Sequence, residues 1–104
     1  MEFRVADRSE VSSTEARTFR AGDREVILCD VDGEVYALDA ICTHEDLPLE
    51  GGEIDDGRLE CPWHGAVYEI CTGEVRALPA TRPLEVFPVR VDADGGVFVT
   101  VVDG

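Results

Sequence analysis

The sequence contains no apolar stretch long enough to span a bilayer, and its first residues do not form a basic segment followed by an apolar run, as a secretion signal would. It also contains no lysine: nine arginines face twenty-three aspartates and glutamates, for a formal net charge of −14. Such a charge disfavours nucleic acid and anionic membranes as partners; it favours basic protein partners, or simply solubility. We therefore expect a soluble, cytoplasmic protein that binds neither nucleic acid nor membrane.

A sustained helical period is absent as well. Two pairs of strands are expected instead, the first at 25–30 and 34–39, where the Asp32-Gly33 step is typical of a tight hairpin turn. The second pair is expected at 85–91 and 97–102, and Pro88 inside it indicates an edge position or a bulge. Shorter strands are expected at 3–5, 16–19, 52–54, 58–60 and 67–69.

The length of 104 residues suits one domain. These patterns predict a single all-β domain over residues 1–104, built from short antiparallel strands as a sandwich or barrel. Residues from about 41 to 72 are richer in turns, Cys, His and Pro than their flanks. We expect this stretch to form a loop-rich subdomain inserted into the β structure.

Histidine is scarce, and both histidines follow a cysteine closely, in Cys42-Thr43-His44 and Cys61-Pro62-Trp63-His64. Brought together, the two motifs would supply two thiolates and two imidazoles to a metal centre. The even number of four cysteines would also allow disulfides, but in a cytoplasmic protein thiols are more often metal ligands. Zinc also accepts two Cys and two His. In its usual spacing, however, the two cysteines stand together and the two histidines stand together, whereas each motif here contains one of each. Mononuclear iron favours two histidines and a carboxylate, so it fits less well.

The pattern C-x-H, sixteen residues, then C-P-x-H-G resembles the Rieske family of iron–sulfur proteins, and the resemblance extends over nearly the whole chain. It implies one [2Fe–2S] cluster, with Cys42 and Cys61 on one iron and His44 and His64 on the other. Further positions match the family pattern: Thr43, Leu49, Gly52, Gly65, Thr72 and Gly73.

The resemblance also bears on the reduction potential. Leu47 and Trp63 stand where the high-potential branch has a disulfide, and Ala66 stands where that branch has a serine whose hydroxyl reaches a sulfide. Tyr68 matches a tyrosine that donates to a ligand sulfur in that branch. Hydrogen bonds to sulfur stabilise the reduced cluster, so the loss of the serine predicts a potential near the low end of the Rieske range, at roughly −150 mV.

Other residues near the motifs match more than one role. Trp63 is expected to shield the cluster, meet a docking partner or simply pack over the loop, and Gly65 follows the last ligand. Pro79 resembles a proline that packs near the cluster in the family, or it shapes a turn. Cys29 and Cys71 are expected to be packed residues rather than ligands.

No nucleotide loop, separate iron triad or flavin domain is evident. The chain resembles the ferredoxin component of multicomponent ring-hydroxylating dioxygenases, which implies an electron carrier rather than an enzyme. The resemblance further implies a flavin-dependent reductase as electron donor and a terminal oxygenase as acceptor, both docking near His44 and His64. The alternatives are a small Rieske subunit of a nitrite reductase or another oxidoreductase, and a structural zinc-binding interaction module.

Overall fold

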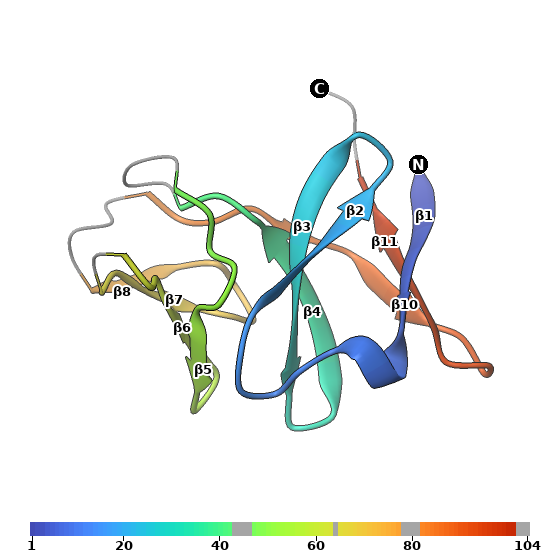
Figure 1. Cartoon of the computed structure of the whole chain (residues 1–104), viewed down its shortest axis with the longest axis horizontal. Coiled ribbons are helices and arrows are strands. Elements are labelled where there is room, and N and C mark those ends of the chain that lie inside the picture. The colour runs from blue at the N-terminus through green and yellow to red at the C-terminus, as the bar shows by residue number, and fades with distance from the viewer. Residues whose placement is uncertain (43–46, 64, 78–81, 102–104) are drawn as a thin grey trace.

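The computed structural model describes residues 1–42, 47–63, 65–77 and 82–101, and Figure 1 shows the arrangement of its strands. The strands are β1 (Glu2–Asp7), β2 (Arg17–Ala21), β3 (Arg24–Val31), β4 (Glu34–Asp39), β5 (Glu53–Asp55), β6 (Arg58–Glu60), β7 (Val67–Glu69), β8 (Val75–Ala77), β9 (Val86–Phe87), β10 (Val89–Val91) and β11 (Gly96–Thr100).

These strands form three antiparallel sheets within the described residues, in the orders β2-β3-β4-β9, β1-β11-β10 and β5-β6-β7-β8. In Figure 1 the β5–β8 sheet lies at the left, the β1-β11-β10 sheet at the right and the β2-β3-β4-β9 sheet between them. The prediction of an all-β fold is confirmed. The strands expected from the sequence are present with ends that agree to within two residues, except that the strand expected at 85–91 is divided at Pro88 into β9 and β10.

The middle sheet is covered on both faces, which explains the uninterrupted apolar run of β3. Val26 and Leu28 belong to one buried cluster, together with residues of β1 and β11. Ile27 and Cys29 point to the opposite face and belong to a second cluster, which they share with the β5–β8 sheet. Since alternate residues of a strand face opposite sides, both sides of β3 must be apolar.

The turn between β3 and β4 is the tight hairpin that the Asp-Gly step predicts. Val31 pairs with Glu34, so only Asp32 and Gly33 lie between the strands. Both have positive φ angles, 52° and 89°, as a type I′ turn requires.

Pro88 separates β9 from β10 and marks where the chain passes from one sheet to another. β9 pairs with β4, whereas β10 pairs with β11. Both strands are at the edges of their sheets, so the edge position predicted for Pro88 is confirmed.

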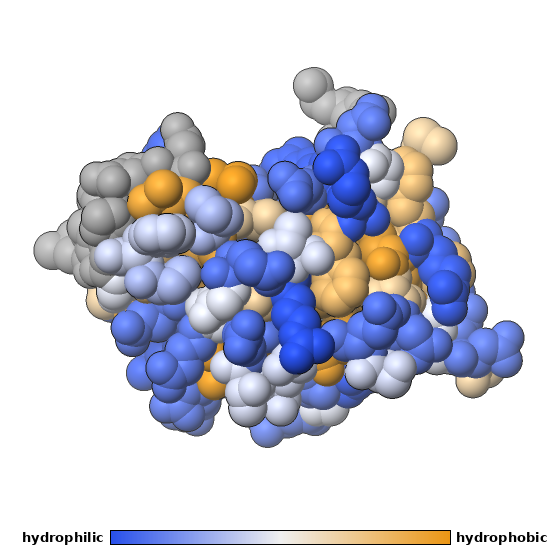
Figure 2. Space-filling view, viewed as in Figure 1, coloured by the Kyte–Doolittle hydropathy of each residue, from blue (hydrophilic) through white to orange (hydrophobic). Residues whose placement is uncertain are grey.

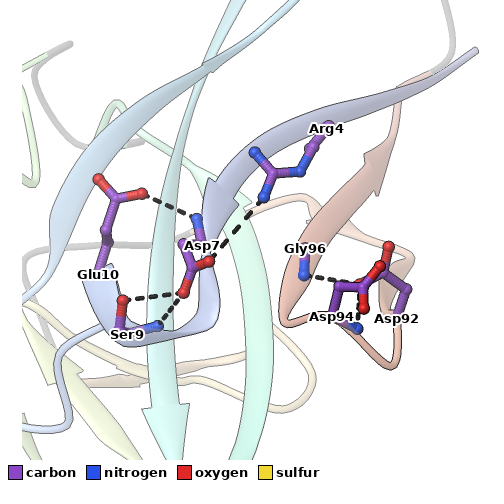
Figure 3. A network of polar contacts seen from close by, with 7 residues as sticks. All are labelled: Arg4, Asp7, Ser9, Glu10, Asp92, Asp94 and Gly96. Atoms are coloured by element: carbon purple, nitrogen blue, oxygen red, sulfur yellow. Dashed lines mark hydrogen bonds and ion pairs between the residues drawn. The ribbon is translucent and has the colours of Figure 1, made fainter.

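Two elements were not anticipated from the sequence. β8 is half exposed and pairs with β7 through an irregular register, so its apolar pattern is weak. A short 3-10 helix, Arg8–Glu10, follows β1; it is capped by the Asp7 carboxylate, which accepts hydrogen bonds from the Ser9 backbone and hydroxyl (Figure 3). These bonds lower the pKa of Asp7. A helix this short produces no detectable period in the sequence.

Figure 2 shows mainly hydrophilic residues on one face of the molecule, with apolar residues exposed between them. Within the described part of the chain, no helix has the length and apolar character needed to cross a membrane.

Candidate metal centre

Two loops at one end of the third sheet are built in the same way. The first Cys loop, residues 40–49, contains Cys42, whose backbone N–H donates to the Leu47 carbonyl at 2.7 Å. The second Cys loop, residues 61–66, begins at Cys61, whose N–H donates to the Ala66 carbonyl, also at 2.7 Å. In both loops the hydrogen bond joins the cysteine to the fifth residue after it. Each cysteine is therefore fixed where its loop closes.

The structure brings the two cysteines into one buried cluster. Each is 1% exposed, and both pack with Leu49, Ala66 and Tyr68 in the core beneath the loops. Neither is part of a disulfide. Two thiols in one buried cluster, neither of them in a disulfide, are a suitable donor set for a soft metal centre.

Tyr68 links the two loops on their buried side. It lies on β7, opposite Leu59 of β6, which leads into Cys61. Its fully buried hydroxyl lies 3.2 Å from the Cys42 sulfur. When Cys42 is a thiolate, the phenol is the donor of this hydrogen bond. The structure thus places the Tyr68 hydroxyl within hydrogen-bond distance of the Cys42 sulfur, and its role beside a cluster stays a prediction.

Residues of the second Cys loop differ sharply in exposure. Ala66 is fully buried and offers only a methyl group to the core. Gly65 is exposed, with a φ of +74°. Trp63 is 57% exposed, yet its indole N–H donates to the Pro48 carbonyl of the first Cys loop at 3.0 Å. Sequence reasoning missed Pro48, because an acceptor on the backbone has no signature in the sequence.

The other predicted site residues, His44, His64 and Pro79, lie outside the described residues. Their roles stay predictions.

The remaining two cysteines lie outside both Cys loops. Cys29 is fully buried on β3, and burial raises its pKa to about 12, so it stays an uncharged thiol. Cys71 is exposed in the turn after β7. A hydrogen bond with Cys71 raises the pKa of the Tyr36 phenol. Cys29 is packed as the sequence predicts, whereas the prediction of a packed Cys71 is wrong, because the turn after β7 leaves its side chain exposed.

Comparison with known proteins gives consistent matches. A family model described as the Rieske [2Fe-2S] domain matches residues 1–88. The ferredoxin component of biphenyl 2,3-dioxygenase from Rhodococcus jostii (strain RHA1) is 32% identical over 91 residues, covering 88% of this chain and 85% of the relative.

Two solved structures share the fold closely. The Sphingomonas yanoikuyae B1 ferredoxin has a TM-score of 0.90 and 30% identity, covering 98% of this chain and all of that one. A chain in a complex of reduced oxygenase and oxidised ferredoxin of carbazole 1,9a-dioxygenase has a TM-score of 0.83 and 33% identity. That match covers 94% of this chain and 91% of the other.

Proposed function

This chain belongs to the family of Rieske [2Fe–2S] domains, and on that premise we propose that it carries single electrons to a terminal oxygenase. Family membership implies that its cofactor is a [2Fe–2S] cluster. When bound, the cluster accepts and releases one electron. The related proteins are named as ferredoxin components, which are electron carriers and not catalysts.

We assign four ligands: Cys42 and Cys61 on one iron, His44 and His64 on the other. The observation that carries this assignment is the pair of buried thiols, each fixed at the closing hydrogen bond of its loop. They are free of disulfides and share one core cluster, as two thiolates on a single iron would require. Each Cys loop also carries one of the two histidines in the chain. The other proposed neighbours of the cluster are Trp63, Gly65, Ala66, Tyr68 and Pro79.

The residues around the thiols bear on the potential. Tyr68 can donate a hydrogen bond to the Cys42 sulfur, and this contact favours the more negative, reduced state. Ala66 has no hydroxyl to add a second such bond. With one donor present and the other missing, we propose a potential towards the low end of the Rieske range, near roughly −150 mV.

Replacing Tyr68 by phenylalanine should lower this potential. A hydrogen bond that favours the reduced state by about 1 kcal/mol corresponds to about 40 mV for one electron. The measurement is a redox titration followed by the visible absorption of the cluster. Tyr36→Phe is the matched control, since its phenol contacts Cys71, which lies outside both Cys loops. An equal shift in both variants would show that the contact with Cys42 does not tune the cluster.

We propose a terminal oxygenase as electron acceptor and a flavin-dependent reductase as donor, both docking near His44 and His64. Ferredoxin and oxygenase stand together in the solved carbazole 1,9a-dioxygenase complex, which supports the first partner. Trp63 directly precedes His64 and is 57% exposed, so it offers an aromatic surface next to a residue near which the partners are proposed to dock. The net charge of −14 favours basic docking faces.

We further propose that residues 1–104 form a single domain that acts in the cytoplasm. The free, exposed thiol of Cys71 suits a reducing compartment.

The function is tested by reducing the purified protein and recording its electron paramagnetic resonance spectrum. We expect the signal of a [2Fe–2S] cluster with mixed Cys and His ligands. Mixing the reduced protein with a ring-hydroxylating oxygenase component should then oxidise the cluster, more slowly as salt is added. A missing signal after anaerobic reconstitution would refute the cluster, and a signal without transfer to the oxygenase would refute the proposed acceptor.

A further inference from the structure

Trp63 joins the two Cys loops on their exposed side. Its indole N–H comes from the second Cys loop, two residues after Cys61, and donates to the Pro48 carbonyl of the first. We propose that this inter-loop hydrogen bond is a positioning contact that keeps the two Cys loops closed over the cluster and slows the loss of iron. The inference rests on the proposed ligand assignment and gives a role to a residue that binds no iron.

The geometry of the first Cys loop leaves the Pro48 carbonyl free for this contact. Pro48 forms an isolated antiparallel bridge with Ile41. The flanking hydrogen bonds run from Cys42 N–H to the Leu47 carbonyl and from Leu49 N–H to the Ala40 carbonyl. In such a pair, the two opposed residues exchange no backbone hydrogen bonds with each other.

The acceptor is also rigidly placed. The Pro48 ring fixes φ, and the Pro48 carbonyl shares its planar peptide unit with the Leu49 N–H, which is held by the Ala40 carbonyl at 2.8 Å. Ile41 is the residue before Cys42. The Trp63 hydrogen bond to Pro48 is therefore linked, through the Ile41–Pro48 bridge, to the backbone next to Cys42.

The inter-loop hydrogen bond complements the Tyr68 contact. Tyr68 reaches the Cys42 sulfur from the buried side, at 3.2 Å, and senses the charge of the cluster. Trp63 reaches the backbone of the same loop from the exposed side, at 3.0 Å, and contacts no sulfur in this bond. Opening the two loops requires the exposed contact to break, so Trp63 should control the rate of opening more than the potential.

Packing of the ring is not the only contribution expected from Trp63, because its N–H also forms the inter-loop hydrogen bond. More than half of its surface is exposed, so its packing contributes less than that of a core aromatic. The N–H and the ring can be separated by experiment, because Trp63 is the single tryptophan of the chain. A tryptophan auxotroph supplied with benzothienylalanine would produce protein altered at this residue alone, with the ring shape kept and the N–H removed.

The experiment measures iron release from the loaded protein to a ferrous chelator, under reducing conditions. The benzothienylalanine protein should release iron roughly three- to tenfold faster than the parent, the range expected for one partly exposed neutral hydrogen bond. Trp63→Gln loses the ring but keeps an N–H donor of similar reach, and should release iron more slowly than Trp63→Leu, which loses both. The midpoint potential of the benzothienylalanine protein should stay close to that of the parent.

Equal release rates for the parent and the benzothienylalanine protein would overturn the proposal, since the ring alone would then protect the cluster. Equal rates for Trp63→Gln and Trp63→Leu would overturn it as well. The paramagnetic resonance signal of the parent separates these results from failure of the proposed function. With that signal present, equal rates reject only the role of Trp63; without it, the cluster assignment itself fails.

Discussion

Replacing Cys61 by alanine should yield a folded chain that holds no [2Fe–2S] cluster, whereas Cys71→Ala should retain one cluster per chain. Cys61 is 1% exposed at the closing hydrogen bond of its loop, and its side chain shares a core with Cys42. Cys71 is exposed and outside both Cys loops. Both substitutions remove a thiol, so any difference in cluster content between the two variants is due to the position of that thiol.

The expected effect is large because a thiolate ligand contributes both charge and a metal–sulfur bond. Residues that merely orient a ligand typically alter metal affinity by about 10- to 100-fold, and loss of the ligand should exceed this. Iron per chain should therefore fall below about a tenth of that in the parent. The measurements are iron and sulfide content, visible absorption, and circular dichroism to verify the β structure.

The ligand assignment would be wrong if Cys61→Ala kept a full complement of iron with an unchanged spectrum. Loss of the cluster in Cys71→Ala with its β structure intact would be equally damaging, because the exposed thiol would then be required. Since the Cys61 amide and not its side chain closes the loop, alanine retains that backbone hydrogen bond. The alanine variant is thus a test of the sulfur and not of the loop.

The sequence singled out Cys42 and Cys61 as a pair, but it did not show that their two loops close at the same spacing. The histidine follows Cys42 by two residues and Cys61 by three, so the motifs look different. In the structure both loops close on the fifth residue after the cysteine. The two loops are alike in their backbone hydrogen bonds, and every residue type except proline can donate such a bond, so residue identity does not reveal it.

Among the strands too, pairings between neighbours in the sequence were predictable, whereas pairings between distant segments were not. The hairpin of β3 and β4 followed from alternating apolar residues and one Asp-Gly turn, all of which are local. The pairing of β9 with β4 joins residues far apart in the chain, and only the proline between β9 and β10 hinted at a break. The acceptor for Trp63 was likewise hidden, because Pro48 acts through its carbonyl.

Replacing Gly73 by alanine should destabilise the fold far more than the same change at Gly33, which serves as the matched control. Both glycines have positive φ angles, +77° and +89°. At Gly33 an added methyl group would meet nothing within 4 Å, whereas at Gly73 it would overlap the Leu84 carbonyl oxygen. Of the two positions, Gly73 alone combines backbone strain with a collision.

The collision is with backbone and cannot be relieved by rotating a side chain. The Leu84 N–H donates to the Gly73 carbonyl at 2.8 Å, so the two segments are held together at the point of overlap. Moving Leu84 away would disturb the entry to β9 and its pairing with β4. The turn after β7, which carries Tyr68, would shift with it.

The left-handed conformation costs alanine roughly 1–2 kcal/mol, which is the whole effect expected for Gly33→Ala. The collision should raise the loss for Gly73→Ala to about 3–4 kcal/mol. For a domain of this size each kcal/mol lowers the thermal midpoint by roughly 4–8 °C. The two losses differ by about 2 kcal/mol, so thermal unfolding of the loaded proteins at one scan rate should place Gly73→Ala roughly 8–16 °C below Gly33→Ala. Similar midpoints would mean that φ strain alone acts at both turns and that the segment at Leu84 moves aside without cost.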